Sequence, residues 1–192
     1  MKIIIIGCSA GGLQALSQVL ERLSVGLSVP VVVIQHRANE HVNLLEEVLQ
    51  HRCGIKVKQA DEKEKIRPGI VYVAPPGYHL LFENDHTFSL SSDGPVKHSM
   101  PSIDVSLESA AMVFGKALVA IILTGASDDG ATGIRTVRKY GGLTIAQDPA
   151  EAQFPHMPQS AIDTGCVRFI LPLAGISNLL AARRFTSAHE EK

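Results

Sequence analysis

Lys2-Ile-Ile-Ile-Ile6 and the Gly7-Cys-Ser-Ala-Gly-Gly12 that follows it are the stretch that decides the fold. The β-branched run is too short for a helix and apolar on both faces, as is typical of a parallel strand covered on both sides. After the glycines, apolar residues recur at helical spacing, at Leu13, Leu16, Val19, Leu20 and Leu23. The chain therefore begins with a strand, a turn and a helix.

Strand and helix patterns continue to alternate along the chain. They predict strands at 30–34, 55–57, 70–74, 117–123, 143–146 and 166–170. They predict helices at 42–49, 102–114 and 131–139, with Ser102 as a cap. Segments 79–82 and 87–90 could pair as an antiparallel hairpin, and 148–158, with three prolines, is predicted to be a surface loop. This alternation predicts an α/β fold, a three-layer α/β/α sandwich around a doubly wound, mostly parallel sheet.

Length and charge limit the classes of function. The 192 residues suit one domain, predicted at 1–185, with a polar C-terminal tail at 186–192. The 18 Lys and Arg balance 19 Asp and Glu, so nucleic acid is not an expected partner. No segment is long and apolar enough for a membrane span. Three scattered cysteines favour neither a disulfide framework nor a zinc site, and we expect a cytoplasmic protein without a metal.

Polar residues follow three of the predicted strands. Ser9 follows the first, His36 follows the second, and Asp128 and Asp129 follow the strand at 117–123. In open α/β sheets, sites form beyond the carboxyl ends of the strands. A serine hydroxyl becomes a nucleophile when an imidazole takes its proton and a carboxylate orients that imidazole. The sequence therefore predicts a serine hydrolase, and spacing alone does not choose between Asp128 and Asp129.

The glycine-rich turn supports two interpretations. Gly7-Cys-Ser-Ala-Gly11 fits the G-x-S-x-G turn that exposes a nucleophilic serine. The same glycines could cradle a nucleotide or a phosphoprotein, although neither the six-residue dinucleotide fingerprint nor a Gly-Lys-Ser/Thr triplet is present. A binding module without hydrolase activity is therefore the alternative. A decayed esterase retained as a scaffold is a third hypothesis, and the intact Ser–His–Asp set argues against it.

Seven short motifs occur in one register across residues 2–182, and together they carry a family resemblance. They are Gly7-Cys-Ser-Ala-Gly-Gly12, Gln35-His36, Tyr72-Val-Ala-Pro-Pro-Gly77, Pro101-Ser-Ile-Asp104, Ile122-Leu-Thr-Gly125, Asp129-Gly-Ala131 and Met157-Pro158. The set resembles the catalytic domain of the bacterial chemotaxis protein-glutamate methylesterases, the CheB type.

The resemblance implies hydrolysis of glutamate γ-methyl esters on chemoreceptor-like helical signalling proteins, together with deamidation of glutamines. It implies Ser9 as nucleophile, His36 as base and Asp129, rather than Asp128, as the orienting carboxylate. Backbone N–H groups near Ala10 and Ala126 would bind the oxyanion. No metal or organic cofactor is implied.

Three features depart from the family pattern. A receiver domain normally precedes this type of catalytic domain, and none is expected before the first strand here, so a receiver protein could act in trans. Met100 replaces the Arg that usually precedes Pro-Ser-Ile-Asp, and Ala10 replaces a Thr. The exchange at Met100 suggests a changed substrate preference, whereas a backbone donor at Ala10 survives the change of side chain.

Overall fold

A single parallel sheet organises the part of the chain that the computed structural model describes, residues 1–23, 27–37 and 45–182. Its strand order is β3-β4-β2-β1-β7-β8-β9, and all pairs are parallel. The strands are β1 (Ile3–Cys8), β2 (Val31–Gln35), β3 (Lys56–Gln59), β4 (Ile70–Val73), β7 (Leu118–Ile122), β8 (Leu143–Gln147) and β9 (Phe169–Leu171). A separate antiparallel hairpin joins β5 (His79–Phe82) to β6 (Phe88–Ser91). The predicted fold class is confirmed.

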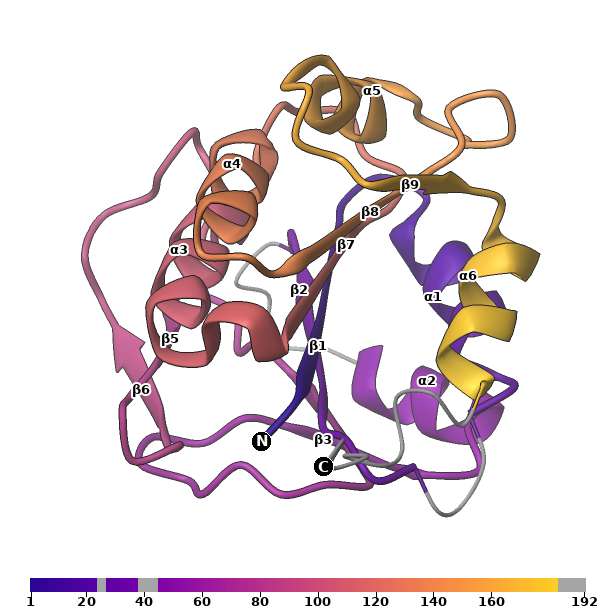
Figure 1. Ribbon diagram of the computed structural model, residues 1–192. Coiled ribbons are helices and arrows are strands. Elements are labelled where there is room, and N and C mark those ends of the chain that lie inside the picture. The colour runs from indigo at the N-terminus through magenta and orange to yellow at the C-terminus, as the bar shows by residue number, and fades with distance from the viewer. Residues whose placement is uncertain (24–26, 38–44, 183–192) are drawn as a thin grey trace, which may run out of the picture.

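Helices cover both faces of the sheet (Figure 1). On one face lie α1 (Gly12–Leu20), α2 (Leu45–Arg52) and α6 (Leu173–Ala181). On the other lie α3 (Ile103–Phe114), which ends in a 3₁₀ turn at Gly115–Ala117, α4 (Ala131–Lys139) and α5 (His156–Asp163). The first residues of the predicted helix at 42–49 and the predicted tail at 186–192 lie outside the described residues.

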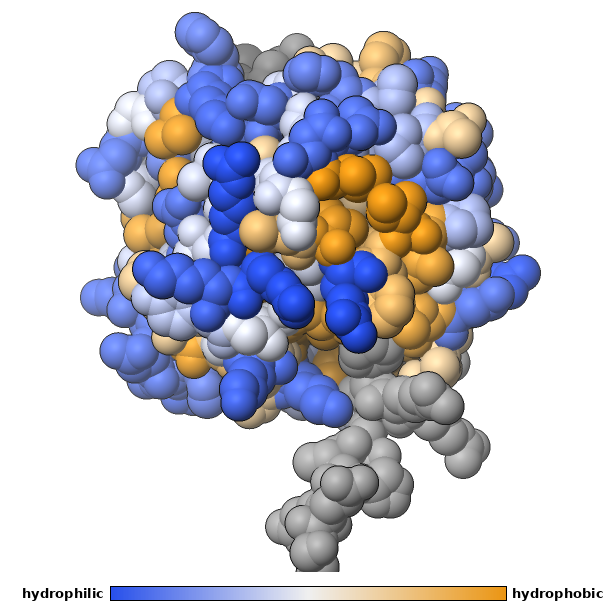
Figure 2. All heavy atoms as spheres, turned by 45° about the horizontal axis from the view of Figure 1, so that its top comes forward, coloured by the Kyte–Doolittle hydropathy of each residue, from blue (hydrophilic) through white to orange (hydrophobic). Residues whose placement is uncertain are grey.

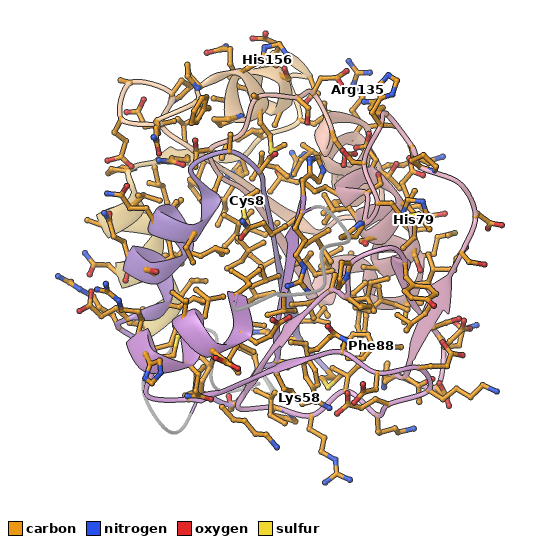
Figure 3. All side chains as sticks on the ribbon, turned by 180° about the vertical axis from the view of Figure 1, so that it is seen from behind. Cys8, Lys58, His79, Phe88, Arg135 and His156 are labelled. Carbon is orange, nitrogen blue, oxygen red and sulfur yellow. The ribbon has the colours of Figure 1, made fainter. Side chains whose placement is uncertain are left out.

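The first strand shows why a continuous apolar run was needed. All six residues of β1 are buried. Ile4, Ile6 and Cys8 belong to the core under α1 and α6, whereas Ile3 and Ile5 belong to the core under α3 and α4. Because successive strand side chains point to opposite faces, a strand between two helical layers must be apolar at every position. Cys8 is therefore a core residue (Figure 3).

Two helices differ from the sequence-based expectation. The predicted loop at 148–158 ends early, because α5 begins at His156 and buries Met157 and Pro158. Proline is tolerated in a first helical turn, where its missing N–H has no intrahelical acceptor. Helix α6 was not predicted. Its small residues weaken the helical pattern, and its burial of Ile176 and Leu180 against the α1 layer stabilises it.

Candidate active site

The carboxyl ends of β2, β1 and β7 are neighbours, because the sheet order places β1 between the other two (Figure 1). Backbone hydrogen bonds continue past these ends. The Ser9 N–H donates to the Thr124 carbonyl at 3.0 Å, and the His36 N–H donates to the Cys8 carbonyl at 3.1 Å. The segments that carry Ser9, His36 and Asp129 therefore meet at one edge of the sheet.

Ser9 is the first residue of a tight turn between β1 and α1. The Gly12 N–H donates to the Ser9 carbonyl at 2.8 Å, and Gly11 has φ 75° and ψ −2°. Those angles belong to the third position of a type II turn, which strongly favours glycine. The chain therefore changes direction within four residues, and this is how a serine becomes presented at the mouth of an α/β sheet.

Gly7, two residues before the serine, lets a helix approach the strand closely. A Cβ atom at Gly7 would stand 2.6 Å from Cγ2 of Ile103, the first residue of α3. This glycine is therefore required for packing, which the sequence pattern alone could not distinguish from a phosphate loop. The contact also fixes the start of α3 next to the end of β1.

His36 and Asp129 form a short hydrogen bond. His36 Nε2 lies 2.7 Å from Asp129 Oδ2, and the two side chains are 12% and 0% exposed. Asp128 is exposed and pairs with Lys97 Nζ at 3.2 Å instead. In the structure His36 is therefore hydrogen-bonded to Asp129 and not to Asp128, whereas residue spacing alone did not choose between the two aspartates.

The amino terminus of α3 binds the Asp129 carboxylate. Oδ2 accepts from the Ile103 N–H at 2.7 Å, and Oδ1 accepts from the Asp104 N–H and from Ser102 Oγ, both at 3.0 Å. Unpaired N–H groups and the helix dipole make such a terminus a favourable site for an anion. Ser102 also caps the helix, as predicted, by accepting from the Val105 N–H.

These donors determine the charge state of the site. Burial alone would raise the pKa of Asp129, but the hydrogen bonds from His36 and from the Asp104 and Ile103 N–H groups hold that pKa below its ordinary value. Asp129 is therefore an ionised acceptor, and His36 Nε2 must carry the proton that joins them. In the neutral imidazole, Nδ1 is then the nitrogen that can accept a proton.

His79 supports the same helix terminus from the interior, and no sequence pattern pointed to it. It lies in β5, is 2% exposed, and its Nδ1 accepts from the Ser102 N–H at 3.1 Å. Its Nε2 lies 3.1 Å from the Gly94 carbonyl and donates to it. The ring is buried because β5 packs against α3 (Figure 3).

Asp104 is a second buried carboxylate, and sequence analysis gave it no role of its own. Its Oδ1 accepts from the Gly130 and Gly133 N–H groups at 2.8 and 2.7 Å, and its Oδ2 pairs with Lys97 Nζ at 3.0 Å. Burial and the neighbouring Asp129 charge raise the pKa of Asp104. Its presence in the Pro101-Ser-Ile-Asp104 motif was the signal that could have identified it.

A tight turn at 96–99 brings one more hydroxyl to the site. Val96 and Ser99 exchange two backbone hydrogen bonds, and Lys97 and His98 between them have φ 49° and 63°. Ser99 Oγ lies 3.2 Å from His36 Nδ1. Among the described residues, the Ser9 side chain forms no hydrogen bond with His36. No sequence pattern pointed to Ser99.

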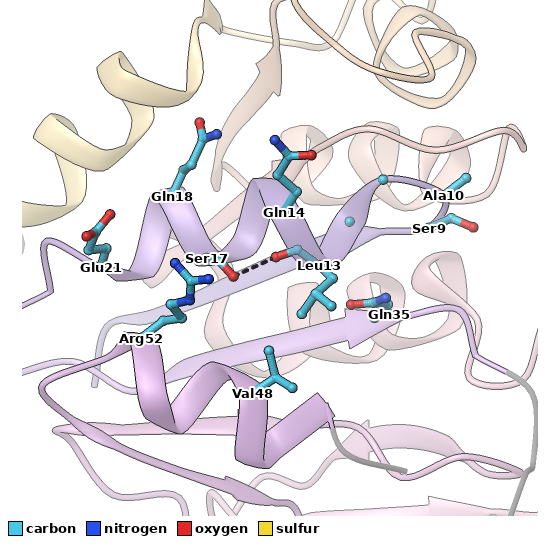
Figure 4. A pocket seen from close by; sticks show the side chains of 12 residues that line it. Ser9, Ala10, Leu13, Gln14, Ser17, Gln18, Glu21, Gln35, Val48 and Arg52 are labelled. Atoms are coloured by element: carbon cyan, nitrogen blue, oxygen red, sulfur yellow. Dashed lines mark hydrogen bonds between the residues drawn. The ribbon is translucent and has the colours of Figure 1, made fainter. Parts of the chain in front are cut away.

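Two depressions lie on the described surface, and the first of them adjoins the serine turn. One, of about 780 Å³, runs from Ser9 along α1 towards Arg52 on α2, with Gln14 and Gln18 on its wall (Figure 4). The other, of about 440 Å³, lies against Ala126 and Phe154. Figure 2, turned towards the carboxyl ends of the strands, shows an apolar area among hydrophilic side chains. In the depression beside Ser9, Gln14 and Gln18 offer polar contacts to an incoming partner, and Leu13 and Val48 offer apolar contacts.

The described residues contain neither a candidate metal site nor a helix that could span a membrane. Within residues 1–23, 27–37 and 45–182, no three His, Cys, Asp or Glu side chains are grouped to hold a metal ion. In the same ranges no helix has the length and apolarity needed to cross a bilayer.

Comparison with known proteins gives a consistent result. The family model described as CheB methylesterase matches residues 4–180. A curated relative from Leptospira interrogans (strain Fiocruz L1-130) is 44% identical over 176 residues, which are 92% of this chain and 91% of the relative. The protein-glutamate methylesterase/protein-glutamine glutaminase of Symbiobacterium thermophilum is 36% identical over 179 residues, 93% of this chain and 49% of that protein.

A solved structure agrees along the same length. The crystal structure of the Thermotoga maritima CheB methylesterase catalytic domain superposes with a TM-score of 0.90 and 33% sequence identity. The match covers 94% of this chain and 97% of that one.

Proposed function

Because this chain belongs to the CheB methylesterase family, we propose that it hydrolyses glutamate γ-methyl esters on helical, chemoreceptor-like signalling proteins. The family assignment confirms the resemblance that the seven motifs carried and the class of carboxylic ester hydrolase that came with it. The roles of single residues and the identity of the substrate protein are part of the proposal.

One observation carries the residue roles. An ionised, buried Asp129 binds His36 Nε2 at 2.7 Å, at the edge of the sheet where a sharp turn presents Ser9. A carboxylate that fixes an imidazole beside an accessible hydroxyl is the arrangement required for nucleophilic serine catalysis. We assign Ser9 as nucleophile, His36 as general base and Asp129 as the carboxylate that orients it.

The first half of the reaction proceeds from these roles. Ser9 Oγ attacks the ester carbonyl carbon while His36 Nδ1 takes the hydroxyl proton. The carbon–oxygen bond to the methoxy group then breaks, and methanol leaves with the proton that the imidazolium returns. Asp129 stabilises the positive imidazolium throughout. The products of this half are methanol and an acyl-enzyme on Ser9.

The second half uses water in the same way. His36 Nδ1 takes a proton from water, the hydroxide oxygen attacks the acyl carbon, and Ser9 leaves with the returned proton. The product is a free glutamate γ-carboxyl group. With a glutamine substrate the same sequence releases ammonia, which requires stronger protonation of the leaving group by His36.

Two backbone donors are assigned to the oxyanion. Ala10 lies in the serine turn and Ala126 in the loop after β7, and neither N–H donates to an acceptor among the described residues. Donors aimed at the developing negative charge lower the barrier without rearranging during the reaction. The exchange of the family's usual Thr for Ala10 leaves this backbone donor in place.

The proposed partners are set by the proposed substrate. A methylated receptor presents its glutamates on cytoplasmic helices, so we place the reaction in the cytoplasm. The chain spans about half the length of several curated relatives, including the one from Symbiobacterium thermophilum. A receiver protein acting in trans is the regulator that we propose.

The test is methanol release from a methylated chemoreceptor cytoplasmic fragment. Wild type should release methanol, and Ser9→Ala should lose activity by roughly 10⁴-fold or more while its circular dichroism and thermal unfolding stay unchanged. Ser89→Ala, which removes a half-buried hydroxyl from β6 at the position paired with Leu81, serves as the matched control and should remain active.

A fluorophosphonate probe separates a wrong substrate from a wrong mechanism. If neither protein releases methanol but the probe labels Ser9, the serine chemistry stands and the substrate class is wrong. If the probe also fails and a nucleotide raises the melting temperature, the binding-module alternative replaces the esterase.

A further inference from the structure

Ser99 occupies a position that no motif predicted and that the proposed mechanism does not use. Its hydroxyl lies 3.2 Å from Nδ1 of His36, the nitrogen on the side away from Asp129. Because Asp129 is an ionised acceptor, the proton of the neutral imidazole is on Nε2. Nδ1 then carries only a lone pair, so the Ser99 hydroxyl must be the donor in this contact.

That lone pair is also required by the reaction. Ser9 can attack an ester only when Nδ1 is available to take its proton. Among the described residues, His36 has hydrogen bonds to Asp129 and Ser99 through its side chain, and none to Ser9. Two hydroxyls therefore compete for one acceptor, and in this structure Ser99 has it.

The turn that carries Ser99 is fixed by charge as well as by its backbone. Lys97 Nζ reaches Asp104 Oδ2 at 3.0 Å and Asp128 Oδ2 at 3.2 Å. Asp104 in turn binds the Gly130 N–H, next to Asp129 in the chain. The segment that presents Ser99 and the loop that presents Asp129 are therefore tied together, which sets the distance between Ser99 and the imidazole.

We propose that Ser99 is a positioning residue that occupies the proton-accepting nitrogen of His36 when no substrate is bound. The inference rests on the proposed esterase function. Ser99 is not the nucleophile. The hydrogen bond holds the ring in place, and it must break before Ser9 can transfer its proton. Binding of the substrate protein at the surface around the turn at 96–99 would therefore activate the base by releasing it.

The proposal predicts that Ser99→Ala makes Ser9 more reactive. A small fluorophosphonate cannot rearrange the turn, so its rate of reaction reports how available Nδ1 is in the free enzyme. In that reaction Ser9 Oγ bonds to phosphorus, fluoride leaves, and His36 takes the hydroxyl proton. We expect the second-order rate constant to rise about threefold to tenfold, the factor that corresponds to one neutral hydrogen bond.

Two further variants distinguish this role from a structural one. Ser99→Thr keeps the hydroxyl and should restore a rate near that of wild type. Lys97→Gln loosens the turn without removing the hydroxyl and should give a smaller increase. Ser89→Ala, which removes a half-buried hydroxyl from β6, is the matched control and should leave the rate unchanged. Loss of a merely structural contact would lower the melting temperature and slow the labelling.

A spectroscopic measurement tests the contact without relying on hydrolysis. The ¹⁵N resonance of His36 Nδ1 should move towards that of a free imine-type nitrogen in Ser99→Ala and return in Ser99→Thr. An unmoved resonance would overturn the proposal, as would a labelling rate that does not rise. Mass spectrometry that finds the label on Ser99 would overturn it too. If Ser9 is unlabelled in every variant, the proposed function fails, and the resonance alone decides whether Ser99 occupies Nδ1.

Discussion

The two sides of the His36 ring are built very differently. On one side, Asp129 is buried and accepts four hydrogen bonds, from His36, Ile103, Asp104 and Ser102. On the other side, the half-buried Ser99 lies 3.2 Å from Nδ1, and among the described residues no hydrogen bond joins the half-buried Ser9 to the ring. The carboxylate is therefore fixed by the fold, whereas the proton-transfer side is free to exchange partners. In a hydrolase, the first arrangement determines the tautomer and the second permits turnover.

Asp129→Asn would remove the charge that orients His36, and we expect it to cause the largest loss of activity. The amide cannot carry the negative charge that stabilises the imidazolium, and it favours the wrong tautomer of His36. Methanol release should fall by roughly 10³- to 10⁴-fold. Fluorophosphonate labelling of Ser9 should fall in parallel. A loss below tenfold would show that the buried carboxylate does not serve the base.

Gly11→Ala would strain the turn that carries the proposed nucleophile, Ser9. Residue 11 has φ 75°, and a Cβ there would stand 2.7 Å from Gln153 Oε1 and 3.2 Å from Thr124 Cγ2. The strained turn should lower the free energy of unfolding by about 1–3 kcal/mol. Urea unfolding measures this loss.

The natural comparison for that variant is Gly165→Ala, which also replaces a glycine of positive φ (71°) but places its Cβ in open space. It should cost less, because only the backbone is strained. Equal losses at both positions would show that crowding around the serine turn contributes nothing.

The smallest expected effect is on the stability of the folded protein at acid pH, which tests the charge on Asp129. The pKa of Asp129 is lowered in the folded protein. Its contribution to stability is therefore present above the unfolded-state pKa of roughly 3.9 and is lost as pH falls through the lower folded-state pKa. Wild type should exceed Asp129→Asn in unfolding free energy by about 1 kcal/mol at pH 6.

That advantage should shrink below pH 4, which urea unfolding of both proteins across the acid range would measure. Asp104 is present in both proteins, and burial raises its pKa in both, but the part of the rise that comes from the Asp129 charge is lost in Asp129→Asn. A constant difference across the range would contradict the charged state assigned to Asp129.

The meeting of Ser9, His36 and the Asp128–Asp129 pair at one edge of the sheet could be predicted from the residue pattern, and the contact of Ser99 with His36 could not. Ser9, His36 and Asp129 each come after a strong apolar strand, and the carboxyl ends of parallel strands lie together at one edge of the sheet. Ser99 and Lys97 lie in a turn without periodicity, and Ser99 is 63 positions from the histidine that it contacts. Nothing local signals such a contact.

His79 could not be identified from the sequence for the same reason. Its burial depends on where the β5–β6 hairpin folds, and this is decided by Phe82 and Phe88 packing against the helical layer. Its bond to the Ser102 N–H joins segments 23 positions apart. A single histidine at the start of a short strand is part of no sequence pattern that would reveal such a partner.

The packing around Ile103 has a consequence for how the protein folds. Its side chain fills the space left by Gly7 at the end of β1 and by Gly130 in the loop of the carboxylate, while its N–H binds Asp129. One residue thus takes part in hydrophobic collapse and in the assembly of the anion site. The carboxylate half of the active centre should consequently form in the same cooperative step as the core and share its protection from local opening, so that amide exchange there reports global unfolding.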